Sequence, residues 1–154
     1  MNQKSILIIL AVIIIVAIGG FVSYNQFSAA GNNVEVGSAI FSLPDGFNVG
    51  PNHKNDTNIT NGYDTVLVRD CGSDNVSKYI KKYIITEKSK DNTTKIKLKN
   101  FTVDNTVVYK AYPVNHTSDV RYWFEHNGEV YLFYHWNASD NFENIVTDLI
   151  KSVK

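Results

Sequence analysis

The sequence predicts a small α+β protein, in which an N-terminal transmembrane helix precedes an antiparallel β-sheet of about six strands packed with two helices. Three observations lead to this prediction. The chain begins with a long apolar run, its later segments switch between helical and two-residue periodicity, and hairpin turn signals separate several of those segments. The expected order of elements after the membrane segment is ββαββββα.

Length and charge limit the possible classes of protein. The 154 residues fit one small domain after the N-terminal segment. Without Lys4, the chain carries 14 basic and 15 acidic residues, a net charge of −1. Such a balance provides no overall field to recruit nucleic acid or an anionic membrane surface. A lone cysteine, Cys71, excludes an internal disulfide and a cysteine-rich metal site.

The apolar run lies at the N-terminus. Every residue from Ile6 to Val22 is apolar or glycine, and a helix over residues 5–24 would span about 30 Å, the thickness of a bilayer's hydrocarbon core. Lys4 precedes the run, and no charged residue follows it before Glu35. The positive-inside rule therefore predicts a single-pass protein of the cell membrane with its N-terminus in the cytoplasm and its domain outside.

The domain boundaries follow from this assignment. Residues 1–4 form the cytoplasmic N-terminus, residues 25–33 form a linker, and residues 34–154 form the extracytoplasmic domain. A cleaved signal peptide is the alternative, because Ser28-Ala29-Ala30 has the small residues that a signal peptidase accepts. Cleavage after Ala30 would release a secreted form.

Seven Asn-X-Ser/Thr triplets lie beyond the apolar run, where N-glycosylation would occur in an extracytoplasmic domain. The chain has 18 Asn and 21 Ser plus Thr, from which about 2.5 triplets are expected by chance. The alternative explanation is that these residue types favour turns and therefore cluster in loops. The candidate acceptors are Asn55, Asn58, Asn75, Asn92, Asn100, Asn115 and Asn137.

The first half of the domain predicts two strands and a helix. Residues 34–43 predict a strand that ends at a Pro-Asp-Gly turn, and residues 63–71 predict a second strand. Between them, residues 50–62 contain one apolar residue in thirteen and predict an exposed loop. A helix follows, with Ser73 or Asp74 as its N-cap. Its apolar stripe consists of Val76, Tyr79, Ile80, Tyr83 and Ile84.

The second half predicts two hairpins and a final helix. Apolar residues alternate from residue 94 to 111 around a turn at Asp104-Asn105, and a second hairpin turns at Asn127-Gly128, a pair typical of a type I′ turn. The last helix begins behind a Ser139 or Asp140 cap. Its wide apolar stripe consists of Phe142, Ile145, Val146, Leu149, Ile150 and Val153.

The second hairpin holds seven aromatic residues between residues 121 and 137. A two-residue turn places Tyr122, Phe124, Tyr131 and Phe133 on one face, which we expect to lie in the core against the C-terminal helix. The other face carries Arg121, Trp123, Tyr134 and Trp136. Two interpretations of this face remain open. In the first, Arg121 lies over the Tyr134 ring in a structural cation–π contact. In the second, Trp123, Tyr134 and Trp136 form a stacking platform for a glycan, and Arg121 is its polar group.

The sequence contains no recognisable catalytic or metal-binding pattern. His126 and His135 share a face with Glu129, but about 20 Å of strand separates the two ends of that face, which is too far for one metal ion. A Gly-rich phosphate loop, a Gly-x-Ser-x-Gly elbow and a His-Glu-x-x-His stretch are all missing from the sequence. We therefore expect neither an enzyme nor a bound metal or cofactor.

The order of these segments resembles that of the PsbP/Mog1/DcrB-like domains. The resemblance covers about residues 35–154 and rests on FSLPDGF, the long polar loop, KIKLKNFTVDNTVVYKAY, YWFEHNGEVYLFYH and the final helix ending in DLIKSVK. The chain is also similar to small membrane-anchored proteins of methanogenic archaea. The frequent Asn, Ile and Lys indicate a low-GC genome, and an archaeal cell surface would agree both with this composition and with N-glycosylation. The resemblance implies an antiparallel sheet between helices and a role in binding or scaffolding. The Asn-rich loop at 50–62 departs from the family pattern.

Two functional hypotheses follow. The preferred one is a membrane-tethered extracytoplasmic scaffold or accessory domain without catalytic activity. Its partners would be the lipid bilayer, through residues 5–24, and another envelope protein or cell-wall glycan, with no role for nucleic acid. The alternative is a glycan- or small-ligand-binding surface module that uses Trp123, Tyr134 and Trp136. Exposure of these three rings distinguishes the two hypotheses.

Overall fold

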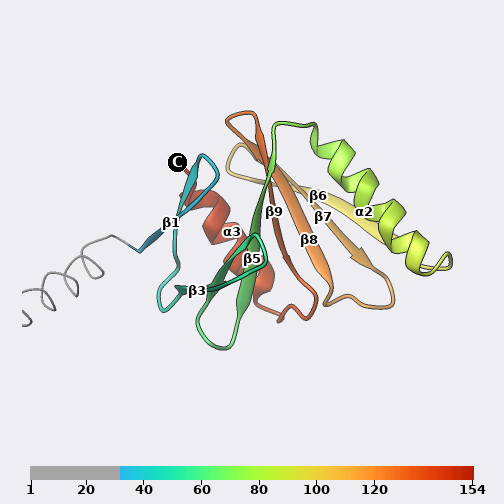
Figure 1. Ribbon diagram of the computed structural model, residues 1–154, viewed down its shortest axis with the longest axis horizontal. Coiled ribbons are helices and arrows are strands. Elements are labelled where there is room, and N and C mark those ends of the chain that lie inside the picture. Colours follow the sequence, from blue (N-terminus) through green and yellow to red (C-terminus); the bar gives the residue numbers. More distant parts are fainter. Residues whose placement is uncertain (1–31) are drawn as a thin grey trace, which may run out of the picture. The chain divides into compact units, whose positions relative to one another are not determined.

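Two antiparallel sheets and two helices make up residues 32–154, the part of the chain that the computed structural model describes (Figure 1). The strands are β1 (Asn33–Val36), β2 (Ala39–Ser42), β3 (Asn48–His53), β4 (Asp56–Thr60), β5 (Thr65–Gly72), β6 (Ile96–Val103), β7 (Thr106–Pro113), β8 (Val120–His126) and β9 (Glu129–His135). The helices are α2 (Val76–Lys90) and α3 (Phe142–Ser152). The α+β class with an antiparallel sheet and two helices is confirmed.

The main sheet has seven strands in the order β3-β4-β5-β9-β8-β7-β6. Helix α3 packs on one face of this sheet and α2 on the other, so the central strands are covered on both sides (Figure 1). The predicted transmembrane helix at residues 5–24 lies outside the described residues. Within residues 32–154, neither helix is long and apolar enough to cross a membrane.

The aromatic hairpin has the predicted register. Strands β8 and β9 pair Tyr122 with Phe133, Phe124 with Tyr131 and Arg121 with Tyr134. The turn residues Asn127 and Gly128 have φ values of 52° and 80°, as a type I′ turn requires.

One face of this hairpin forms the main core, as predicted. Tyr122, Phe124, Tyr131 and Phe133 are buried in one cluster with the apolar stripe of α3. Phe41 of β2 adds a fifth ring, which lies edge-on against Phe124, Tyr131 and Phe133 at centroid distances of 5.4–6.4 Å. The C-terminal helix therefore covers the face that the alternation of the sequence indicated.

The predicted first strand is in fact a hairpin. The alternation of residues 34–43 continues across Gly37, but the chain reverses there and pairs β1 with β2 as a separate two-stranded sheet. Gly37 has a φ of 60°, a left-handed conformation that glycine adopts without the steric cost of a side chain. Apolar alternation does not distinguish one strand from two strands joined by a tight turn.

The predicted exposed loop at residues 50–62 is also wrong. This segment contributes to the β3–β4 hairpin, and β4 pairs with β5 in the main sheet. Asp56 and Ile59 of β4 are buried, although their neighbours are polar. Backbone pairing at the sheet edge and a buried ion pair hold this hairpin in place, and neither feature requires an apolar sequence.

Both predicted N-caps differ from those in the structure. Helix α2 begins after Asn75, whose side-chain oxygen accepts a hydrogen bond from the Ser77 amide at 2.8 Å, so neither Ser73 nor Asp74 is the cap. Helix α3 begins after Asn141, which makes no capping hydrogen bond to the backbone. A cap depends on which residue leaves helical geometry, and several adjacent Ser, Asp and Asn residues can fill that position.

Candidate functional site

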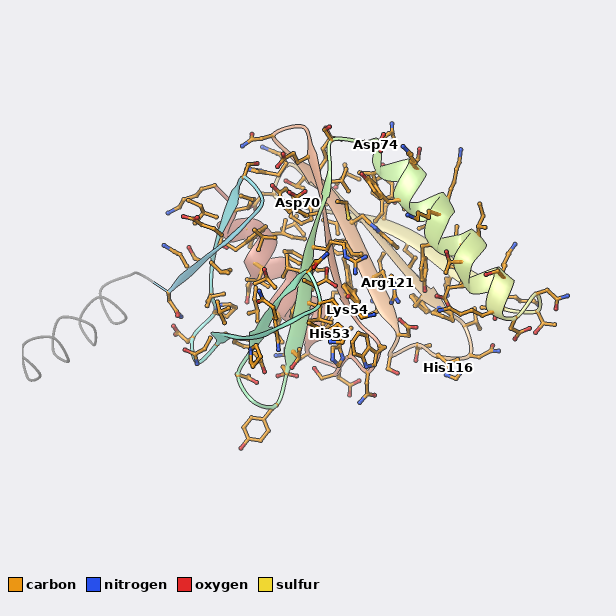
Figure 2. All side chains as sticks on the ribbon, viewed as in Figure 1. His53, Lys54, Asp70, Asp74, His116 and Arg121 are labelled. Carbon is orange, nitrogen blue, oxygen red and sulfur yellow. The ribbon has the colours of Figure 1, made fainter. Side chains whose placement is uncertain are left out.

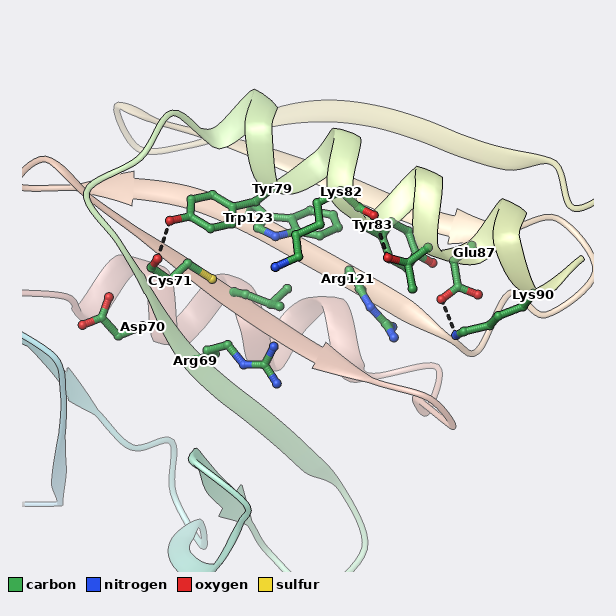
Figure 3. A pocket seen from close by; sticks show the side chains of 12 residues that line it. Arg69, Asp70, Cys71, Tyr79, Lys82, Tyr83, Glu87, Lys90, Arg121 and Trp123 are labelled. Atoms are coloured by element: carbon green, nitrogen blue, oxygen red, sulfur yellow. Dashed lines mark hydrogen bonds and ion pairs between the residues drawn. The ribbon is translucent and has the colours of Figure 1, made fainter. Parts of the chain in front are cut away.

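A cleft of about 410 Å³ lies between α2 and the sheet face formed by β5, β8 and β9 (Figure 3). We call it the α2 cleft. The sheet lines it with Arg69 and Cys71 from β5, Arg121 and Trp123 from β8, and Leu132 from β9. Helix α2 contributes Tyr79, Lys82, Tyr83, Thr86, Glu87 and Lys90. The cleft thus combines an apolar floor with several positive charges.

Arg121 lies at the centre of this sheet face. Its side chain is mostly buried, and its guanidinium carbon is 4.8 Å from the ring centroid of Tyr83 and 5.3 Å from that of Tyr134. The guanidinium also forms an ion pair with Asp119. The predicted cation–π contact with Tyr134 is confirmed, and the contact with Tyr83 adds a second ring from the helix.

An ion pair between half-exposed Arg69 and buried Asp56 borders the cleft. Arg69 donates from Nε and Nη2 to the two carboxylate oxygens of Asp56, at 2.6 and 2.7 Å, and the Tyr134 hydroxyl donates to the same carboxylate at 2.5 Å. Burial alone would raise the pKa of Asp56, but these hydrogen bonds outweigh it and lower that pKa below its usual value. Burial and the Asp56 carboxylate raise the pKa of Tyr134 to about 12. Asp56 is therefore ionised, and Tyr134 is a hydrogen-bond donor.

Tyr83 has a hydroxyl without a hydrogen-bond partner among residues 32–154. The residue is 7% exposed, and no hydrogen bond reaches its hydroxyl from any described residue. Its ring lies 5.5 Å from that of Trp123, centroid to centroid. Burial raises the pKa of this phenol, although the nearby Arg121 opposes the shift. The hydroxyl therefore keeps its proton and is available as a donor.

Cys71 lies on the wall of the α2 cleft, and its backbone oxygen accepts a hydrogen bond from the Tyr79 hydroxyl. Burial raises the pKa of its thiol to about 11, with Arg69 opposing the shift. Little of the thiol is therefore ionised at neutral pH, whereas a nucleophilic cysteine needs its thiolate form.

The four residues of the predicted ligand face do not lie together at the surface. Arg121 and Trp123 line the α2 cleft, but Trp123 is 2% exposed and Tyr134, packed between the two arginines, is 7% exposed. Trp136 is 49% exposed and packs against the rings of His53 and His135, each at a centroid distance of 5.2 Å. The three aromatic rings therefore form no continuous open platform.

Sequence reasoning missed Arg69, Lys82 and Tyr83 as residues of the cleft. The helical periodicity indicated Tyr83 only as part of an apolar stripe, and nothing in the sequence marked Lys82. Their common position follows from the packing of α2 over β5, β8 and β9, which no local pattern encodes. The only signal was the mixed character of the sheet face, where Arg121 lies among aromatic residues.

The candidate glycosylation sites fall into two groups. Six of the seven asparagines are exposed, in turns, at the α2 cap or on the edge strand β6: Asn55, Asn75, Asn92, Asn100, Asn115 and Asn137. Asn58 is different, because it lies within β4 with its side-chain oxygen buried and its amide donating to the Pro51 carbonyl at 3.2 Å. Of the seven, Asn58 is the least accessible to a glycosylating enzyme.

Two of the four histidines, His53 and His135, pack against Trp136, and His116 and His126 lie elsewhere. Figure 2 shows His53, at the end of β3, well apart from His116, in the connection between β7 and β8. His126 and His135 lie at opposite ends of the β8–β9 hairpin, as predicted. Within residues 32–154, no three His, Cys, Asp or Glu side chains are grouped so that they could hold a metal ion.

Comparison with known proteins finds similarity at the level of structure. Neither a protein-family model nor a curated protein sequence matches the chain. The structure is similar to the solution structure of cyanobacterial PsbP (CyanoP) from Synechocystis sp. PCC 6803, with a TM-score of 0.46 and 13% sequence identity. The match covers 75% of this chain and 85% of that one. This similarity concerns the fold alone.

Proposed function

We propose that this protein is a membrane-tethered accessory domain that acts outside the cell membrane by binding, without catalysing a reaction. The apolar run from Ile6 to Val22, with Lys4 before it, supports the tether and its orientation. The observation that carries the binding role is the lining of the α2 cleft, which sets the apolar side chains of Trp123 and Leu132 beside the cationic side chain of Arg121 in a space of about 410 Å³. Its occupant would be a ligand or an exposed group of another envelope component.

The chemistry of the cleft supports binding over catalysis. General acid–base catalysis needs a group whose pKa lies near the working pH. Arg69 and Arg121 remain protonated in proteins, and burial raises the pKa values of the Cys71 thiol and the Tyr83 phenol. These four groups therefore donate hydrogen bonds at neutral pH but exchange protons poorly.

Photo-crosslinking in intact cells tests this proposal. A photoreactive amino acid replaces Thr86, which is exposed on α2 at the cleft, and in a matched control it replaces Asp148, which is exposed on α3 at the opposite face of the sheet. We expect a defined crosslinked product from position 86 and none from position 148. Equal products from both positions, or none from either, would contradict a binding role for the cleft.

A glycan-binding role at Trp136 is the second candidate. Its ring is half-exposed and held by His53 and His135, an arrangement that suits stacking against a sugar. This candidate needs neither Trp123 nor Tyr134. Trp123→Ala and Trp136→Ala, assayed for glycan binding, distinguish a glycan site at Trp136 from binding in the α2 cleft.

A further inference from the structure

The positive charges of the α2 cleft are only partly neutralised from within it. Glu87 accepts a hydrogen bond from Lys90 at 2.6 Å, so these two charges compensate each other at one end. Asp70 also borders the cleft, but its carboxylate accepts from the Gly72 amide at 2.7 Å and lies close to Gly37. Figure 3 shows it directed away from α2. Asp56 and Asp119 compensate the two arginines from outside the cleft, and no carboxylate among residues 32–154 pairs with Lys82.

The two arginines retain free donors. Arg69 uses Nε and Nη2 for Asp56 and Tyr134, and Arg121 uses Nη1 for Asp119, so Nη1 of Arg69 and Nη2 of Arg121 take no part in these bonds. Neither Asp56 nor Asp119 lines the cleft. Lys82 forms no ion pair with any residue between 32 and 154. Guanidinium and ammonium groups of this kind bind carboxylates and phosphates.

Tyr83 points independently to a ligand. A buried hydroxyl without a hydrogen-bond partner is rare in proteins, and this one belongs to a residue that lines the cleft beside Arg121. An acceptor oxygen in the cleft would complete its hydrogen bonding. The neighbouring Trp123 and Leu132 provide apolar contact for the remainder of the ligand.

We propose that the α2 cleft binds an organic anion whose carboxylate or phosphate group is held by Lys82 and Arg121 and accepts a hydrogen bond from Tyr83. Arg69, on the other side of the Tyr134 ring, is left to bind a second polar group of the ligand. The apolar part of the anion would lie against Trp123 and Leu132. This assignment rests on the proposed use of the cleft as a binding site. The same chemistry is found in a free small anion and in an acidic sugar of a surface glycan.

Calorimetric titration of the full-length protein in detergent micelles tests the proposal. The anionic probes are benzoate, phenyl phosphate and an oligosaccharide of uronic acids, and the neutral controls are benzamide and an uncharged oligosaccharide of the same length. We expect at least one anion to bind saturably and its neutral counterpart not to bind. If the oligosaccharide of uronic acids binds about tenfold or more tightly than benzoate and phenyl phosphate, the natural ligand is an acidic glycan. If it binds equally or more weakly than they do, the natural ligand is a free small anion.

The structure offers closely matched variants. Lys82→Gln and Lys81→Gln remove the same charge from adjacent exposed positions of α2, but only Lys82 lines the cleft. We expect Lys82→Gln and Tyr83→Phe each to weaken binding by about tenfold, the loss typical of one charge-assisted hydrogen bond, and Lys81→Gln to leave the Kd unchanged. Tyr83→Phe removes only an unpartnered hydroxyl, so its melting temperature should equal or exceed that of the unaltered protein.

Two results would overturn the assignment: no saturable binding of any anionic probe, or equal weakening by Lys81→Gln and Lys82→Gln. If no anion binds but position 86 still crosslinks to a partner, the ligand class is wrong and the binding role remains. If both experiments fail, the proposed function fails with the ligand class.

Discussion

The Arg69 guanidinium donates two hydrogen bonds to the Asp56 carboxylate, at 2.6 and 2.7 Å, and so joins β5 to β4 across the sheet. Asp56 is 1% exposed, whereas about half of the Arg69 side chain is open to solvent. The Tyr134 hydroxyl adds a third bond from β9. This network fixes a polar hairpin against the sheet and forms the border of the α2 cleft.

Loss of Arg69 should destabilise the domain, because it leaves the buried carboxylate of Asp56 without its cation. We expect Arg69→Ala to lower the free energy of unfolding by about 2 kcal/mol, less than the roughly 3 to 5 kcal/mol of a fully buried pair because Arg69 is half-exposed. Urea denaturation measures this change. Lys151→Ala, at an exposed position of α3, is the control and should change the free energy by less than about 0.5 kcal/mol. Equal effects of the two variants would contradict a structural role for the pair.

The same network predicts a dependence of stability on pH. The pKa of Asp56 is lower in the folded protein than its ordinary value of 3.8, since hydrogen bonds from Arg69 and Tyr134 outweigh its burial. The resulting stabilisation is therefore complete above that value and is lost as the pH falls through the folded-state pKa. Asp56→Asn should melt well below the unaltered protein at neutral pH, and the difference should narrow below about pH 4. If the difference in melting temperature between Asp56→Asn and the unaltered protein stays constant from neutral pH to below about pH 4, the lowered pKa of Asp56 is wrong.

Phe124 tests the choice of core face. Its ring is fully buried among Phe41, Tyr131 and Phe133, so Phe124→Ala should lower the free energy of unfolding by about 3 to 5 kcal/mol. Ile85→Ala, which truncates an exposed side chain of α2, should have little effect in the same denaturation experiment. A change within experimental error for Phe124→Ala would mean that this face is not the core.

The two tryptophans should behave differently. Trp123 is buried beneath α2, so Trp123→Ala should lower the melting temperature by about 10 °C or more. Trp136→Ala should change it little, because the ring is half-exposed. Both variants are also assayed for binding to cell-wall glycans. Lost glycan binding with unchanged melting in Trp136→Ala would favour the glycan-binding candidate over the cleft.

The proposed orientation predicts which positions a membrane-impermeant maleimide reaches in intact cells. In a Cys71→Ser background, Tyr63→Cys should be labelled, because Tyr63 is 98% exposed in the connection between β4 and β5. Gln3→Cys, on the cytoplasmic side of the proposed anchor, should be labelled only after permeabilisation. The reverse pattern, or protection of both positions, would exclude a domain tethered outside the membrane.

Local sequence was sufficient for the central part of the fold. The two-residue alternation and the Asn127-Gly128 turn predicted the register of the aromatic hairpin, since a type I′ turn leaves one pairing for its strands. The helical stripe of the last segment likewise predicted which face of that hairpin it covers. Each of these features depends on residues that are close together in the chain.

The errors have two different causes. Nothing near Asp56 indicates that it lies in a strand, because the Arg69 and Tyr134 side chains that allow its burial come from other strands. The turn at Gly37 is local, but the apolar alternation of residues 34–43 continues through it and concealed it.

By itself, the sequence determined the α+β class, the aromatic hairpin with its core face, and the cross-strand pairing of Arg121 with Tyr134, because short-range periodicity and turn chemistry specify them. Only the tertiary structure decided that Trp123 and Tyr134 are buried while Trp136 is exposed, and that Arg69, Lys82 and Tyr83 meet at one cleft. The physical reason is that exposure and side-chain proximity depend on where α2 packs over the sheet. That position follows from the shapes of surfaces contributed by β5 and by the β8–β9 hairpin, which are far apart in the chain.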